Sequence, residues 1–184
     1  MKRSRLALLL APAGVFLLLS AVYLISGLFP YGENTLAWGD MTQQVIPLLL
    51  ELKQILLGPE TLSFTQLTAG GMNFFGVFLF FLSSPFSFLV LLIPDTELIL
   101  WVNVLVLLKL MLAGWSAQWF FWKQYPRLPA VWTVLLGISY ALCGYGLLFF
   151  QNLVWLDVMA LFPLLMLALG RMIRTGRMLP FVLA

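Results

Sequence analysis

Long apolar stretches separated by short polar loops dominate this chain, and they predict helices that cross a bilayer. The first stretch, residues 6–29, carries no charged residue, and a helix of this length can span a membrane with some tilt. We therefore expect an all-α integral membrane protein, a polytopic helical bundle. The spans are expected at residues 6–29, 98–122, 131–150 and 153–170, and a further one begins at residue 178.

The start of the chain indicates how these spans are oriented. Basic residues before a first span favour a cytoplasmic N-terminus, and Lys2, Arg3 and Arg5 stand there. A cleaved signal peptide has an apolar core of about 7–15 residues, which is shorter than residues 6–29. We interpret this stretch as an uncleaved anchor, so the loop that follows opens on the outer face.

The apolar stretch at residues 74–93 decides the topology. If it crossed the membrane, the basic loops at residues 123–127 and 171–177 would lie outside, against the positive-inside rule. Ser83-Ser84-Pro85 lies in its middle, and proline disfavours helix just before it. Each half is too short to span the membrane. We therefore expect an interfacial or re-entrant segment, within one outer loop at residues 30–97.

The same outer loop is expected to carry a second interfacial helix at residues 40–57. Its apolar residues recur at helical spacing, whereas Glu51 and Lys53 fall largely on the other side. Pro47 would break a continuous helix, so the regular part is expected to begin near it. The apolar stripe consists of Val45, Leu48, Leu49, Leu52, Ile55 and Leu56.

The composition agrees with a membrane protein. Hydrophobic residues make up 62% of the chain and charged residues 9%, against about 25% charged residues in soluble domains. The mean hydropathy is +1.03. The net charge of +3 arises from short basic clusters near the ends of spans. It carries information on topology and does not indicate nucleic-acid binding.

The chain contains no histidine, which excludes Ser-His-Asp, Cys-His and His-metal chemistry for these residues. Acid–base work would fall to Asp, Glu, Lys or Tyr. The single cysteine, Cys143, lies in an apolar run, so no disulfide can form within the chain.

Asp40 is the first candidate for chemistry, because it follows Trp38 in the loop after the first span. In one interpretation Asp40 caps the following helix, since Asp40 with Gln43 resembles a capping box. In the other, Asp40 is a general base at the membrane surface that takes a proton from an acceptor hydroxyl. Spacing alone leaves both open.

Lys109 is the second candidate, because it lies near the centre of the span at residues 98–122. It is about 16 Å from either end, too far for its side chain to reach the membrane surface. It must face the bundle interior, a water-filled cavity or an anion, and that anion is either a lipid phosphate or a paired carboxylate. Asp157 lies about one turn into its helix, on the same outer face as Asp40. There it either benefits from the helix dipole or positions sugar hydroxyls or Lys109.

Two further segments could contact a substrate. Trp155, beside Asn152, could stack on a sugar ring, although aromatic residues at this depth also anchor helices in the interface. The glycines of residues 65–76 could let a substrate approach closely, or they form a flexible connector.

Several short motifs follow one another along the chain. They are Gly39-Asp40, Gln44-x-x-Pro47, Gly70-Gly71-Met-Asn-Phe-Phe-Gly76, Leu82-Ser-Ser-Pro-Phe86, Leu108-Lys109, Ser139-Tyr-Ala-Leu-Cys-Gly-Tyr145 and Asn152-Leu-Val-Trp-Leu-Asp157. Their order resembles the N-terminal part of the YfhO family of bacterial multi-span membrane proteins, over nearly all of the 184 residues.

That family is similar to GT-C glycosyltransferases, which transfer a sugar from a polyprenyl-phosphate carrier outside the cytoplasmic membrane. Its members are associated with glycosylation of teichoic acid and related cell-envelope polymers. The resemblance implies that Asp40 is the catalytic base and that Lys109 stabilises the leaving phosphate. The expected partners are the lipid-linked sugar, the polymer acceptor and membrane lipid. The substrate-binding residues expected are Lys109, Asp157, Asn152, Trp155, Gln44 and Asn73.

No cofactor beyond the lipid-linked sugar donor is expected, and no metal, because no paired-carboxylate spacing requires one. A transporter or flippase component, with Lys109 and Asp157 in its substrate path, is an alternative function. A non-catalytic assembly subunit is another. The apolar run that begins at Met178 reaches only Ala184, so we expect the chain to be the N-terminal piece of a longer protein or a truncated gene product.

Overall fold

The computed structural model describes residues 5–58, 61–66 and 70–182. Lys2 and Arg3, on which the expected orientation depends, lie outside the described residues, as do residues 67–69 of the glycine-containing loop. The described part is all helix and loop, without strands, and about 75% of it is helical. The expected all-α membrane fold is therefore confirmed.

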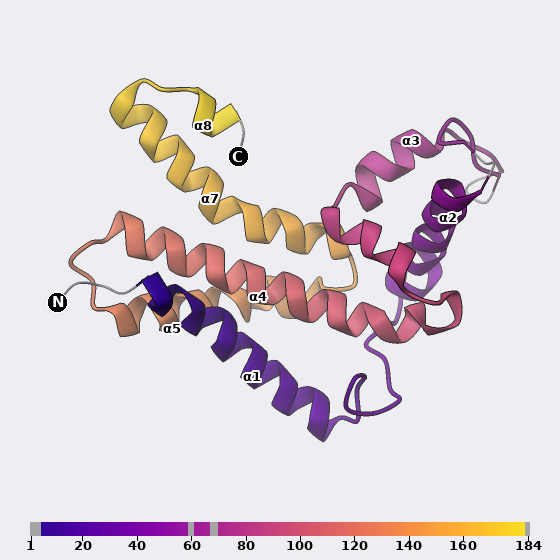
Figure 1. The fold of residues 1–184 in the computed structure, drawn as a ribbon, viewed down its shortest axis with the longest axis horizontal. Helices are drawn as coiled ribbons and strands as arrows, with labels where there is room; N and C mark the ends of the chain where they lie inside the picture. The colour runs from indigo at the N-terminus through magenta and orange to yellow at the C-terminus, as the bar shows by residue number, and fades with distance from the viewer. Residues whose placement is uncertain (1–4, 59–60, 67–69, 183–184) are drawn as a thin grey trace. The chain divides into compact units, whose positions relative to one another are not determined.

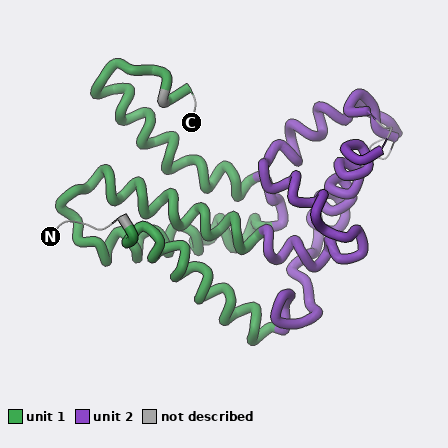
Figure 2. The backbone as a smooth tube through the Cα atoms, viewed as in Figure 1, with its two compact units in different colours: residues 1–26, 106–150, 155–184 green, residues 27–105, 151–154 purple. Residues whose placement is uncertain are grey.

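The chain forms two compact units (Figure 2). The first unit consists of residues 1–26, 106–150 and 155–184, and the second unit consists of residues 27–105 and 151–154. Most of the outer loop expected at residues 30–97 therefore folds as a compact body of its own.

The first unit is built from long apolar helices (Figure 1). The segments long and apolar enough to cross a membrane are Leu6–Ile25, Asp95–Gln124, Ala130–Leu148 and Leu153–Thr175. The helices are α1 (Leu10–Ile25), α4 (Leu98–Gln124, from Val106 onward), α5 (Ala130–Ala141), α6 (Gly144–Leu148), α7 (Leu153–Thr175, from Trp155 onward) and α8 (Leu179–Val182). The stretch expected as one span at residues 131–150 is thus divided between α5 and α6.

Small residues bring α1, α4 and α5 close together. A Cβ atom added to Gly137 of α5 would lie 2.8 Å from the carbonyl oxygen of Gly114 in α4 and 3.0 Å from the Cβ of Ala11 in α1. Only glycine fits between these backbones. Small residues at helix contacts are typical of membrane bundles, where close packing replaces the hydrophobic effect between helices.

The amide of Gln118, on α4, is inserted into the backbone of the first helical segment. Its Oε1 accepts from the Ala11 N–H at 3.1 Å, and its Nε2 donates to the Ala7 carbonyl at 2.6 Å. In a regular α-helix these two backbone groups would bond to each other. Gln118 satisfies both inside an apolar bundle, where unpaired backbone groups are costly.

A proline inside α7 also leaves a backbone group that needs a side-chain partner. Pro163 has no N–H, so the carbonyl of Met159, four residues earlier, lacks its helical donor. The hydroxyl of Tyr140 on α5 donates to that carbonyl at 2.8 Å. This hydrogen bond satisfies the Met159 carbonyl, for which the lipid of the bilayer core offers no donor.

The second unit contains shorter helices. The apolar segments Phe74–Leu82 and Pro85–Leu92 meet at an angle of 103°, with the break at Ser83-Ser84 as expected from Pro85. The elements are the π-helix η2 (Met41–Val45), α2 (Ile46–Leu57), α3 (Phe74–Val77), the π-helix η3 (Phe78–Leu82), the 3-10 helices η4 (Pro85–Leu92) and η5 (Asp95–Glu97), and the start of α4. A bend of this size occurs in a broken span as well as in a re-entrant loop, so the expected topology stays a prediction.

Helix α2 begins at Ile46, close to the start expected from Pro47. The five preceding residues form a π-turn, since Pro47 cannot donate the backbone bond that would continue a regular α-helix through it. The apolar stripe is buried except for Leu56, which is 40% exposed. Glu51, expected on the polar side, is only 3% exposed, so that expectation was wrong.

Candidate functional site

Asn103 on α4 organises the loop that leads to Asp40. Its Oδ1 accepts from the Leu36 N–H at 2.8 Å, and its Nδ2 donates to the carbonyls of Phe29 and Asn34 at 3.2 and 3.1 Å. Asn103 is fully buried. One amide therefore holds three points of the loop, and the last of them, Leu36, lies four residues before Asp40.

Asp40 itself is exposed at the start of a continuous helix. The residue before it, Gly39, has φ of +52°, a left-handed conformation that glycine adopts without strain. A Cβ atom at Gly39 would lie 3.0 Å from Oε1 of Gln151. Gln151, the residue before Asn152, therefore lies beside Gly39 within the second unit. This proximity agrees with the expectation that Asp40 and Asn152 share one face of the membrane, which stays a prediction.

The capping interpretation of Asp40 is wrong. Asp40 has helical dihedrals, and its side chain makes no capping hydrogen bond to the described helix that follows. Two N–H groups of the first turn have backbone partners, because Met41 donates to the Trp38 carbonyl and Gln43 donates to the Gly39 carbonyl, both at 3.1 Å. The carboxylate of Asp40 is therefore available for another partner.

Gln44 and Asn73 have different environments in the second unit. Gln44, one turn after Asp40, lines a cavity of about 530 Å³ between the Gln43–Glu51 helical segment and residues 72–81. Asn73 caps α3, where its Oδ1 accepts from the Phe75 N–H at 2.9 Å. Asn73 therefore has a structural role, and its amide nitrogen remains a potential donor.

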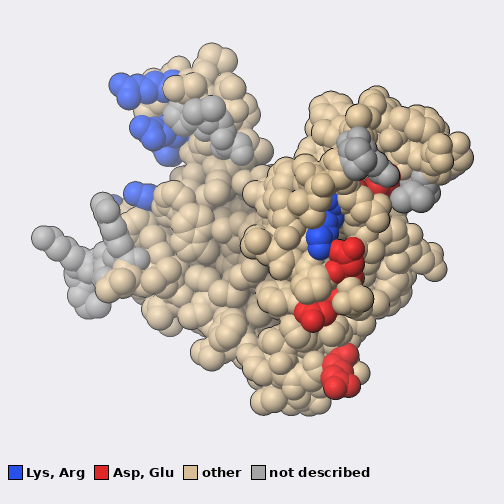
Figure 3. Space-filling model, turned by 45° about the vertical axis from the view of Figure 1, so that its right-hand side comes forward, with Lys and Arg blue, Asp and Glu red and all other residues tan. Residues whose placement is uncertain are grey.

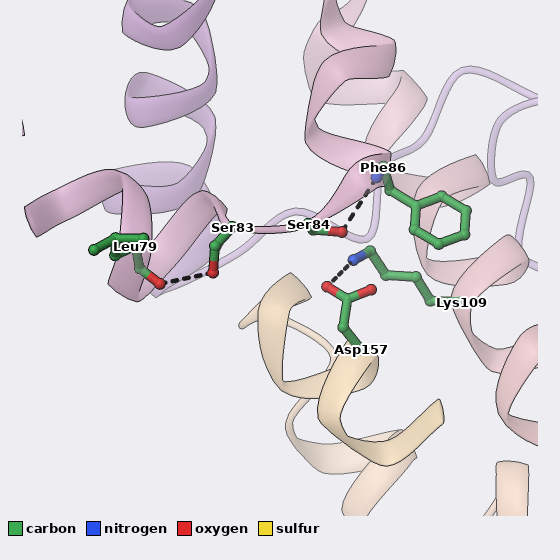
Figure 4. Close-up of polar contacts among 6 residues, drawn as sticks. All are labelled: Leu79, Ser83, Ser84, Phe86, Lys109 and Asp157. Atoms are coloured by element: carbon green, nitrogen blue, oxygen red, sulfur yellow. Dashed lines mark hydrogen bonds and ion pairs between the residues drawn. The ribbon is translucent and has the colours of Figure 1, made fainter. Parts of the chain in front are cut away.

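Lys109 and Asp157 form an ion pair in the first unit (Figure 4). The Nζ of Lys109 lies 2.5 Å from Oδ2 of Asp157, and the two side chains are 2% and 12% exposed. Helix α7 begins at Leu153, so Asp157 stands one turn into it as expected. Of the alternatives for Lys109, the structure favours the paired carboxylate.

Trp155 lies at the N-terminal part of α7 and is 37% exposed. Its ring packs on Phe149, with 5.5 Å between ring centroids. This contact is compatible with belt anchoring, and the exposed part leaves a ring edge or face for a ligand.

Acidic and basic residues are shared unequally between the two units, and Figure 3 shows those that are visible on one face of the molecule. Among the described residues, every acidic one except Asp157 belongs to the second unit, and every basic one except Lys53 belongs to the first. Lys53 is bound within the second unit to Asp95, at 2.6 Å. Arg171, Arg174 and Arg177 are exposed at the C-terminal end of α7. This division agrees with an acidic outer loop and basic inner loops.

The expected site residues are thus found in two groups. Asp40, Gln44, Asn73 and Asn152 belong to the second unit. Trp155, Lys109 and Asp157 belong to the first unit. No group of three or more His, Cys, Asp or Glu side chains that could hold a metal occurs among the residues the structure describes.

The sequence interpretation missed Asn103 and Glu51. Asn103 is a polar residue inside the apolar run at residues 98–122. Like Lys109, such a residue needs a polar partner away from lipid. Glu51 gave no such signal, because a carboxylate between leucines on an amphipathic helix is usually solvated.

The family described as "Bacterial membrane protein YfhO" matches residues 13–184, nearly the whole chain. No curated protein and no solved structure matches. The family match and the apolar helices together establish a multi-pass membrane protein. The chain belongs to the YfhO family of bacterial membrane proteins.

Proposed function

We propose that this protein transfers a sugar from a polyprenyl-phosphate carrier to a hydroxyl group of a cell-envelope polymer such as teichoic acid. Transfer takes place on the outer face of the bacterial cytoplasmic membrane. The observation that carries the proposal is Asp40, an exposed carboxylate without a capping role, on a loop that Asn103 holds in place. Membership of the YfhO family supports the membrane setting.

Asp40 is proposed as the general base. It accepts the proton of the acceptor hydroxyl while that oxygen forms a bond to the anomeric carbon of the sugar. The bond from this carbon to the carrier phosphate oxygen breaks, and the phosphate leaves with the electron pair. The configuration of the sugar inverts in this single displacement.

The remaining residues are proposed to bind the substrates. Gln44 and Asn152, in the same unit as Asp40, offer amide groups that both donate to and accept from sugar hydroxyls. Lys109 is proposed to offset the charge of the leaving phosphate. Because Lys109 is paired with Asp157, this role requires the phosphate to join or replace that carboxylate.

The test replaces Asp40 with Asn in the complete gene product. Transfer of labelled sugar from the polyprenyl-phosphate donor to polymer is measured in membrane vesicles. The expected loss is about 10²–10⁴-fold, the usual contribution of general base catalysis. Glu33→Gln is the control, because Glu33 is an exposed acid of the same loop. Wild-type transfer by Asp40→Asn at normal protein levels would exclude Asp40 as the base.

The buried ion pair of Lys109 and Asp157 favours a second candidate, a transporter or flippase component. Intramembrane ionisable pairs often mark a substrate path. A flippase would move the lipid carrier from one leaflet of the vesicle membrane to the other without forming a glycosidic bond. In that case Asp40→Asn would leave transport intact and Asp157→Asn would abolish it, which separates the two functions.

A further inference from the structure

Glu51 is a buried carboxyl group that forms no ion pair with any residue the structure describes. The residue is only 3% exposed, and its Oε2 has no hydrogen-bond partner among the described residues. The nearest basic residue along α2 is Lys53, whose Nζ is bound to Asp95 and to the carbonyl of Ile93, both at 2.6 Å. Burying a carboxylate without a partner costs free energy, so a bound group of positive charge would stabilise it.

Glu51 lines the cavity of about 530 Å³, a volume typical of small-molecule sites. No Lys or Arg is among the described residues that line it. The polar side chains among its lining residues belong to one helical segment, residues 43–51, and the lining residues from 72–81 are apolar. The residues that characterise it are Gln43, Gln44 and Glu51 on the polar side and Met72, Phe80 and Phe81 on the apolar side.

We infer that this cavity binds a protonated amine carried on an apolar body. The ammonium group supplies both the opposite charge and the hydrogen-bond donor that Oε2 of Glu51 lacks among the described residues. The amide oxygen of Gln43 accepts from one of its remaining N–H groups. The apolar body packs against Met72 and the phenylalanines, whose ring faces also attract a cation.

The same features disfavour other ligands. A phosphate or carboxylate would bring a second negative charge next to Glu51 without a cation to offset it. A neutral polyol would donate hydrogen bonds but would leave the charge uncompensated. The inference goes beyond the sugar transfer proposed above and does not depend on Asp40 as a base.

The test uses a photoreactive alkylamine, dodecylamine with a diazirine in its chain. The complete gene product is irradiated with this probe in phosphatidylcholine nanodiscs, and labelled peptides are identified by mass spectrometry. We expect labelling within residues 72–81, about tenfold weaker in Glu51→Gln, since a charged hydrogen bond is lost. Glu33→Gln, the same change at an exposed site, should label like the wild type.

Competition on the wild-type protein provides a readout that does not depend on any variant. Unlabelled dodecylamine should displace the probe, whereas dodecyl glucoside and dodecyl phosphate should not. Displacement by the glucoside or phosphate but not by the amine would overturn the inference, as would equal labelling of Glu51→Gln. Displacement by phosphatidylethanolamine would assign the amine to a lipid headgroup and would support the inference. Displacement by free ethanolamine at the concentration at which dodecylamine competes would show that no apolar body is needed and would overturn it.

Discussion

The ammonium group of Lys109 and the carboxylate of Asp157 join α4 to α7 at 2.5 Å within the first unit. Removing one partner leaves the other charge buried and unpaired, which costs about 3–5 kcal/mol. Lys109→Met and Asp157→Asn should therefore each lower the free energy of unfolding in detergent by about that amount. The double variant Lys109→Met/Asp157→Leu should recover most of this loss, because an apolar pair of similar size fills the space.

Activity of the double variant separates a structural pair from a functional one. If Lys109 contacts the donor phosphate, the double variant is stable but has lost transfer. A stable double variant with wild-type transfer would show that the pair only holds the helices together. Single variants as stable as the wild type would contradict the buried ion pair itself.

The bond from Tyr140 to the Met159 carbonyl predicts a specific rescue. Tyr140→Phe leaves that carbonyl unsatisfied and should cost about 1–2 kcal/mol. Pro163→Ala restores the backbone N–H that a regular helix directs at the same carbonyl. A double-mutant cycle followed by thermal unfolding should therefore show a smaller cost of Tyr140→Phe in the Pro163→Ala background. Equal costs in both backgrounds would contradict the explanation.

The glycine contact between helices predicts a position-specific loss of stability. A Cβ at Gly137 would lie 2.8 Å from the Gly114 carbonyl oxygen, so Gly137→Ala should cost about 1–3 kcal/mol through overpacking. Gly144→Ala is the matched control, because nothing lies within 4 Å of a Cβ there. The comparison is made by thermal unfolding in detergent, and equal melting temperatures for both variants would rule out close helix packing at Gly137.

Helix position, the proline break and the helical periodicity of α2 could be predicted from the sequence, because each depends on local rules. Apolar length predicted the candidate spans, and Pro85 predicted the bend that the structure places at Ser83-Ser84. The Lys109–Asp157 pair was among the alternatives, since a lysine at mid-membrane needs an anion.

The rest depended on tertiary contacts. Glu51 is buried although periodicity assigned its face of α2 to solvent, and it lines a cavity that residues 72–81 bound on the other side. Asn103 and Gln118 hold backbone groups that lie far from them in the chain. No local pattern identifies such partners, although a polar amide in an apolar span indicates that one exists.

Asn103 predicts how firmly the loop before Asp40 is held. Asn103→Leu removes the acceptor for Leu36 and the donor for two carbonyls, so residues 28–36 should exchange amide hydrogens at least about tenfold faster. Sugar transfer should be lower in Asn103→Leu than in the wild type, because the loop no longer holds Asp40 in place. Asn73→Ala, which removes one cap bond, should change exchange near residue 75 and leave residues 28–36 as in the wild type. Unchanged exchange in Asn103→Leu would contradict the role of Asn103.

The central claim is that Asp40 and Asn152 face the same outer compartment, and single-cysteine labelling tests it most directly. Asp40→Cys, Asn152→Cys and Arg127→Cys are made in a Cys143→Ser background and treated with an impermeant maleimide in intact cells. We predict that positions 40 and 152 react in intact cells, whereas position 127 reacts only after the membrane is opened. Reaction of position 152 only in opened cells would contradict the account.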